Sequence, residues 1–303
     1  MKHRGKVAAV IGAVALSATA FVPAAHANGQ VQQRTAAACS LTAGSITTSG
    51  AHAGADVTAG TPPTMSAPGS EPKIFAPGAV RLSSSFVAEP NVGGVDRSGY
   101  VVEGDNLYYR FYNFNDGGNS LTRIGSGWSK FTAFEIAEYD AGPGRSGYHN
   151  LMYGLRNDGT LFRWSASGES WRRTGTAAGF SSVKSMALIS KTATYDTFLA
   201  NTRGGALYTI RIPVTSPMKP IVKQVRTRSW QGFEYLIAAK CGKAGTLLLG
   251  IDKDTKTGYL YAVGHANGTA TVINGLGKVK GTFPDPVYHR WTVVADLDPL
   301  NGD

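Results

Sequence analysis

The sequence has few charged residues, which are common in helical proteins, and few cysteines, which redox and zinc sites require. Only 17% of its 303 residues are charged, and only two are cysteines. Cys39 and Cys241 lie far apart, which excludes a C-x-x-C redox or zinc motif. The chain must turn often, because it holds 38 glycines and 14 prolines and neither residue suits the interior of a helix. No ten-residue window has a convincing helical period, so we predict an all-β fold.

The common motifs of hydrolase and metal chemistry are absent as well. Neither H-E-x-x-H nor G-x-S-x-G occurs, and the histidines beyond residue 27 are widely spaced. We therefore predict no metal, no cofactor and no catalytic residue, and expect a binding protein rather than an enzyme. A carbohydrate-active hydrolase stays as an alternative, since a glycosidase needs two facing carboxylates and the sequence does not pair them. The carboxylates available for that role are Glu103, Glu135, Glu138, Asp140, Glu169 and Glu234.

Residues 1–27 have the three regions of a secretory signal peptide. Lys2, Arg4 and Lys6 precede an almost wholly apolar run over 7–22, and Ala25-His26-Ala27 fits an A-x-A cleavage site. The run is short for a membrane anchor, and no later stretch is long and apolar enough to span a bilayer. We predict a secreted, extracellular and bacterial protein without a membrane span.

The net charge says little about a specific partner. It is +10 for the whole chain and +7 without the three basic residues of the signal peptide. Such a charge would suit an anionic cell wall or membrane surface, but the basic residues are scattered, which favours a role in solubility. Nucleic acid is not expected as a partner of an exported chain.

Residues 28–72 differ in composition from the rest of the mature chain. They are rich in Ala, Gly, Thr, Ser and Pro, which is typical of a flexible leader or linker. From residue 73 onward the character changes, so we predict a repeat domain over 73–303.

Two motifs alternate four times after about residue 95. The first is a Gly- or Asp-containing turn followed by Leu and alternating residues, and its leucines are Leu107, Leu161, Leu207 and Leu260. The second is aromatic, and its copies begin at Trp128, Phe180, Trp230 and Tyr288. Short strands between tight turns, repeating about every fifty residues, are typical of four-stranded propeller blades. We predict a β-propeller of four to five blades, with residues 71–95 and a C-terminal strand closing the ring.

One copy of the aromatic motif resembles a known family. Residues 124–131 read Ile-Gly-Ser-Gly-Trp-Ser-Lys-Phe, similar to the I-G-x-G-W-x-x-F signature of tachylectin-2-type lectins, and FG-GAP-like repeats of secreted proteins share the strand pattern. The resemblance implies a five-bladed propeller that binds N-acetylated sugars between blades. The other copies depart from the signature, so fewer than five such sites should be intact.

The candidate ligand-binding residues follow from the aromatic motif and the turn beside it. An aromatic ring offers a flat apolar face to a sugar, and neighbouring polar groups can hold its hydroxyl or acetamido groups. The alternative is that these rings pack between blades. The candidates are Gly127, Trp128, Phe131, Asn157, Asp158, Trp230 and Phe233.

These observations lead to three functions in order of preference. We predict a carbohydrate-binding, lectin-like propeller for glycans or cell-wall polysaccharide, with N-acetylated sugars as one class. The first alternative is a non-catalytic protein-interaction or cell-wall-associated structural propeller, and the second is a hydrolase. We also predict a Cys39–Cys241 disulfide, because export removes both thiols from the reducing cytosol.

Overall fold

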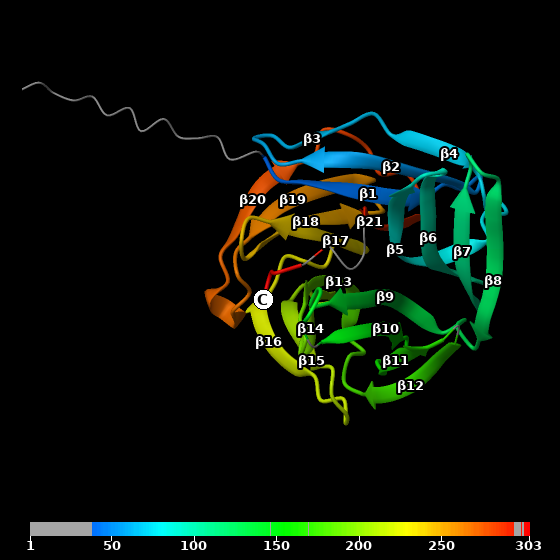
Figure 1. Ribbon diagram of the computed structural model, residues 1–303. Coiled ribbons are helices and arrows are strands. Elements are labelled where there is room, and N and C mark those ends of the chain that lie inside the picture. Colours follow the sequence, from blue (N-terminus) through cyan, green and yellow to red (C-terminus); the bar gives the residue numbers. More distant parts are fainter. Residues whose placement is uncertain (1–37, 146, 169, 294–297, 299) are drawn as a thin grey trace, which may run out of the picture. The chain divides into compact units, whose positions relative to one another are not determined.

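The computed structural model (Figure 1) describes residues 38–145, 147–168, 170–293, 298 and 300–303, with the side chains of 70 and 71 left aside. The predicted signal peptide lies outside these residues. The described part is all-β and contains no α-helix, only the short 3-10 turn η1 (Gly268–Ala270). The prediction of an all-β fold is confirmed.

Three sheets each contain four consecutive antiparallel strands. The second sheet holds β9 (Phe131–Asp140), β10 (Tyr148–Arg156), β11 (Leu161–Ser167) and β12 (Ser170–Ala177). The third holds β13 (Val183–Lys191), β14 (Tyr195–Thr202), β15 (Leu207–Pro213) and β16 (Ile221–Arg226). The fourth holds β17 (Tyr235–Cys241), β18 (Gly245–Asp252), β19 (Thr257–Val263) and β20 (Ile273–Lys278).

A nine-stranded sheet combines two further units. The first unit is β5 (Val80–Asn91), β6 (Gly94–Glu103), β7 (Asn106–Asn113) and β8 (Gly118–Ser126). The closing unit is β1 (Ser40–Ile46), β2 (Ala51–Thr58), β3 (Thr64–Met65), β4 (Gly69–Lys73) and β21 (Val287–Thr292). The C-terminal strand β21 pairs antiparallel with β1 and, over a short stretch, parallel with β5. Segments from both ends of the described chain therefore build one unit.

The strands of the closing unit correct our prediction of a flexible leader over 28–72. From residue 40 onward this segment contains the four strands β1 to β4, and its small residues have a packing role. A side chain added at Gly44 would come within 2.3 Å of the His289 ring, and one added at Gly54 would press on Trp291. The Ala- and Gly-rich composition resembled a linker, but it leaves room for large rings on the neighbouring strand.

Side chains from five strands, one from each of the five units, meet around a central cavity. These inner strands are β5, β9, β13, β17 and β21, and Figure 1 shows the sheets arranged around them. A separate apolar cluster fills each junction between neighbouring units. Several four-stranded sheets around a central channel are the arrangement of a β-propeller.

Backbone hydrogen bonds explain why the two repeated motifs alternate. The N–H of Trp128 donates to the carbonyl of Asp105 in the preceding turn at 3.0 Å. The same bond recurs from Phe180 to Gly159, from Trp230 to Gly205 and from Phe283 to Lys256. In each of these units, the turn before the third strand thus binds the aromatic residue that precedes the first strand of the next unit. The fourth copy is therefore centred on Phe283, which corrects our placement of it at Tyr288.

The predicted disulfide is present. Cys39, directly before β1, bonds to Cys241 at the end of β17, with 5.5 Å between the Cα atoms. The bond fastens the closing unit to the fourth sheet across a sequence separation of 202 residues. It therefore restrains the segment whose pairing with β21 completes the arrangement.

Replacing both cysteines with serine should lower the free energy of unfolding by about 2–4 kcal/mol, because the bond limits the freedom of the unfolded chain. The check is thermal denaturation of the double variant beside the parent, each with and without reductant. Reductant should lower the melting temperature of the parent only. Equal melting temperatures for parent and variant without reductant would show that the bond does not stabilise this fold.

Candidate functional site

The four aromatic rings that the sequence nominated lie in the protein interior. Trp128 is 5% exposed and Phe131 6%, and both belong to the apolar cluster between the first unit and the second sheet. Trp230 and Phe233 are equally buried, but between the third and fourth sheets. The structure thus brings the candidates together as two separate pairs, and each pair packs between sheets instead of presenting an open ring face.

The polar candidates lie in the turns beside the first pair. Gly127 has a positive φ of +87°, and its N–H donates to the side chain of Asp105 at 3.0 Å. Asn157 and Asp158 form the turn between β10 and β11, where the Asn157 N–H donates to the carbonyl of Lys130 at 2.9 Å. Hydrogen bonds from the Arg156 side chain and the Thr160 N–H hold the pKa of Asp158 below its ordinary value. These residues are exposed, and their contacts shape the turns.

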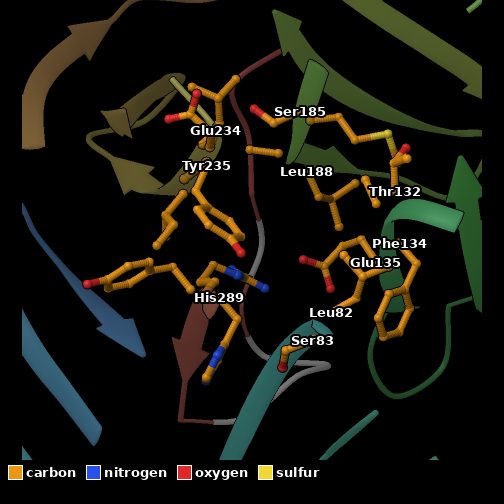
Figure 2. A pocket seen from close by; sticks show the side chains of 18 residues that line it. Leu82, Ser83, Thr132, Phe134, Glu135, Ser185, Leu188, Glu234, Tyr235 and His289 are labelled. Carbon is orange, nitrogen blue, oxygen red and sulfur yellow. The ribbon is translucent and has the colours of Figure 1, made fainter. Parts of the chain in front are cut away.

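The central cavity is small and is lined in part by polar side chains. It has a volume of about 70 Å³, and Figure 2 shows Glu135, Glu234, Tyr235 and His289 among the side chains around it. Arg290 Nε donates to Ser85 Oγ at 3.3 Å, and Ser85 Oγ donates to Glu135 Oε2 at 2.9 Å. Since these groups satisfy one another and the space is narrow, the cavity is a polar centre of the fold with little room for an organic ligand.

A larger pocket opens beside this centre, between the first unit and the second sheet. We call it the inter-sheet cleft; its volume is about 290 Å³. Its lining residues come from β5, β6 and β7 on one side and from β9 and β10 on the other, with β13 and β21 at the inner end. They include Ser85, Glu89, Ser98, Tyr100, Tyr109, Ile136, Glu138, Asn150, Lys191, Arg290 and Thr292.

Strand alternation on the first unit creates one wall of the cleft. Tyr100 on β6 is paired directly with Tyr109 on β7, so both rings point to the same face, with 5.1 Å between their centroids. The edge of Trp171 on β12 packs against Tyr100 at 5.7 Å and holds its orientation. Burial raises the pKa of Tyr100 to about 12, and its protonated hydroxyl can donate a hydrogen bond.

The opposite wall carries hydrogen-bonding groups from the second sheet. Glu138 on β9 and Asn150 on β10 are direct cross-strand partners and both face the cleft. The Asn150 Oδ1 atom is buried and has no hydrogen-bond partner among the described residues. A buried amide oxygen without a partner costs free energy, so a donor from a bound molecule would satisfy a group that the fold leaves open.

Two cationic side chains close the inner end of the cleft. Lys191 on β13 is 5% exposed, and burial lowers its pKa to about 8, with Arg290 as the next cause. Arg290 forms an ion pair with Asp298, which also accepts a hydrogen bond from Thr292 at 2.9 Å. At the inner end, Asp298 therefore fixes the side chains of both Arg290 and Thr292. The wall formed by Tyr100 and Tyr109 extends from there toward the outer strands of the first unit.

Sequence reasoning missed this cleft because it followed the repeated residues. Tyr100 and Asn150 fall outside both repeated motifs, Tyr109 follows Leu107 in the turn motif and was interpreted only as part of a strand, and Glu138 was one of six carboxylates that the sequence could not pair with one another. The available signal was the alternation of Tyr100 with Ser98 and of Tyr109 with Phe111, which gives two adjacent strands a shared face of rings and small polar groups. That face became visible only once the strand register was known.

The part of the chain that the structure describes contains no group of three or more His, Cys, Asp or Glu side chains arranged to hold a metal ion. Within the same residues, no helix is long and apolar enough to cross a membrane.

Comparisons with known proteins do not show which family this chain belongs to. Neither the sequence profiles of known families nor the sequences of curated proteins give a match. Among solved structures, the α-L-arabinofuranosidase PaAbf62A of Podospora anserina in complex with cellotriose is similar at 11% identity and a TM-score of 0.45, covering 70% of this chain and 73% of that one.

Two further solved structures show a weaker likeness. The Aleuria aurantia lectin, in complex with Fucα1-6GlcNAc, has 13% identity and a TM-score of 0.41, covering 78% of each chain. AofleA of Arthrobotrys oligospora has 11% identity and a TM-score of 0.37, covering 81% of this chain and 90% of that one. At these values the likenesses carry no argument, and function has to be argued from the cleft itself.

Proposed function

We propose that this protein is a carbohydrate-binding β-propeller whose ligand lies in the inter-sheet cleft. The observation that carries the proposal is the pairing of an aromatic wall, Tyr100 and Tyr109, with the unpartnered amide oxygen of Asn150 on the wall opposite. A pyranose has an apolar C–H face for the rings and hydroxyl groups around its edge for the amide and carboxylate. Sites of this kind combine apolar surface with a few convergent polar groups.

The finer features of the proposal rest on the same residues and on the sequence. Five units around the cavity support a five-bladed propeller closed by β21. The Asn150 oxygen can accept a hydrogen bond from an acetamido N–H, which supports N-acetylated sugars as the first class to test. The N-terminal signal and the disulfide support export, and N-terminal sequencing of protein from the culture medium would test it by showing whether residue 28 comes first.

Tyr100→Ala should abolish binding on a glycan array that is positive for the parent protein. The substitution removes one ring of the aromatic wall, and with it the flat apolar surface that a sugar ring would cover. Tyr259→Ala is the matched control, because Tyr259 is a partly exposed tyrosine of the fourth sheet, away from the cleft. A parent protein that binds no glycan on the array, while binding wall proteins, would favour the protein-interaction alternative.

A hydrolase is the second candidate, and one observation favours it: Glu89 and Glu138 both line the same cleft. Two facing carboxylates are the minimum that glycosidic bond cleavage requires. If the protein releases reducing sugar from wall polysaccharide, Glu138→Gln should abolish release while glycan binding persists. Absence of release by the parent protein across such substrates would leave binding as the function.

A further inference from the structure

A second pocket continues the inter-sheet cleft toward the outer edge of the first unit. It has a volume of about 590 Å³ and shares Tyr100 and Tyr109 with the cleft. Its other residues include Phe111 on β7, Ser120 and Thr122 on β8, and Ser170 on β12. We call it the outer pocket. Because both pockets use the same two rings, they form one groove rather than two separate sites.

The strand register shows that the groove crosses the whole face of the first unit. Tyr109 is paired with Thr122, and Phe111 is paired with Ser120, so these four side chains project from the same face. Strands lie about 4.8 Å apart, so the distance from β5 to β8 is roughly 14 Å. That is longer than a single pyranose ring needs.

The packing below the groove explains why it stays open. Trp128, Phe131, Phe134 and Phe162 fill the junction between the first unit and the second sheet toward one end of the strands. In the groove the first unit instead presents small side chains, Ser98, Ser120 and Thr122, between its rings. Large rings therefore fill the junction on the Val102 and Leu107 side of Tyr100, and small side chains line it on the other side.

The two ends of the groove differ in a way that fits a chain-like ligand. The inner end meets Lys191 and the side chains of Arg290 and Thr292, which both bond to Asp298, so a ligand cannot continue there without displacing them. At the outer end Ser120 and Thr122 are exposed, and the wall is aromatic with hydroxyl groups. One end is closed and polar, and the other is open and aromatic.

From this geometry, and resting on the proposed carbohydrate binding, we propose that the protein binds a linear oligosaccharide by its end. The terminal ring lies in the inter-sheet cleft, and the following rings extend over Tyr109 and Phe111 into the outer pocket. Affinity then increases with chain length until the outer pocket is filled, and a free monosaccharide occupies only the inner end.

The test is calorimetric titration of the full-length secreted protein with two ladders. One is N-acetylglucosamine with its β-1,4-linked dimer and tetramer, and the other is glucose with the corresponding cello-oligosaccharides. For the ladder that binds, the tetramer should bind about tenfold more tightly than the monomer, a gain equal to roughly 1.4 kcal/mol. Ser120→Tyr should remove this gain, because the new ring fills the outer pocket.

Leu121→Tyr is the matched control, since it places the same ring on the next residue, which points to the opposite face of β8. It should keep the gain with length. Equal affinity for monomer and tetramer in the parent, or a gain that survives in Ser120→Tyr, would overturn end-binding of a chain but leave carbohydrate binding intact. No binding of any member of either ladder would overturn both proposals.

Discussion

Replacing Trp128 with alanine should destabilise the protein by about 3–5 kcal/mol, the usual cost of removing a large aromatic side chain from a core. Its indole is 5% exposed and lies 4.4 Å from the Phe131 ring, 5.3 Å from Trp164 and 5.5 Å from Phe134, measured between centroids. The substitution would leave a cavity in the cluster that joins the first unit to the second sheet. Urea denaturation of parent and variant measures the difference directly.

Two further variants separate packing from ligand contact. Trp128→Phe keeps an aromatic ring in the cluster and should cost less than the alanine variant. Phe114→Ala, at a ring that is 40% exposed, should change the free energy of unfolding by less than about 1 kcal/mol. If Trp128→Ala were as stable as the parent and yet failed to bind glycan, the aromatic motif would be the binding site and our cleft would be wrong.

Acidification from pH 6.5 to 5 should weaken the fold through a buried histidine pair. His52 Nε2 lies 2.9 Å from His289 Nε2, and His52 Nδ1 lies 2.7 Å from the Tyr112 hydroxyl. Burial lowers the pKa of His289 to about 3. The pKa of His52 is also lowered, by burial first and then by the charges of His289, Arg97 and Arg110.

The lowered pKa values of His52 and His289 determine the direction in which stability changes with pH. An unfolded histidine titrates near pH 6.5, so protons bind the unfolded chain first and favour unfolding. The stabilising contribution of the neutral pair is complete above about pH 6.5 and is lost as the pH falls toward 3. At pH 5 the loss from His289 alone is about 2 kcal/mol.

The measurement is the free energy of unfolding by urea at several pH values between 7 and 5. His289→Gln removes one of the two titrating groups, so its curve should be flatter than that of the parent even if the variant is less stable overall. His265→Asn, at an exposed histidine, is the control and should keep the slope of the parent. Parallel curves for His289→Gln and the parent would show that the pair does not set the acid sensitivity.

The repeated parts of the fold could be predicted from the sequence because their cause is local. A Gly- or Asp-containing turn before Leu161 or Leu207 specifies a hairpin, and the aromatic residue that its carbonyl holds follows 21 to 27 residues later in each of the four copies. The closing unit could not be predicted in the same way. Its β1 and β2 are rich in Ala, Gly and Thr, and the reason for those small residues, the rings of His289 and Trp291, lies about 240 residues further along the chain.

The candidate site was even harder to predict from the sequence than the closing unit. The sequence nominated Trp128 and Trp230 as sugar-binding residues, but in the structure both rings are buried between sheets. Sequence alone does not separate the two roles, because large aromatic rings are common both in protein cores and in sugar-binding sites. The residues of the inter-sheet cleft come from seven strands, and only their register puts Tyr100 beside Tyr109 and both opposite Asn150. The disulfide was easier, because two cysteines have only one possible pairing within the chain.

The most direct test of the account is a crystal structure of the protein with the glycan that binds best on the array. We predict ligand density in the inter-sheet cleft, with a sugar ring against Tyr100 and Tyr109 and a donor within hydrogen-bonding distance, about 3 Å, of Asn150 Oδ1. Density at the turns beside Trp128 or Trp230, with the cleft holding only water, would contradict it.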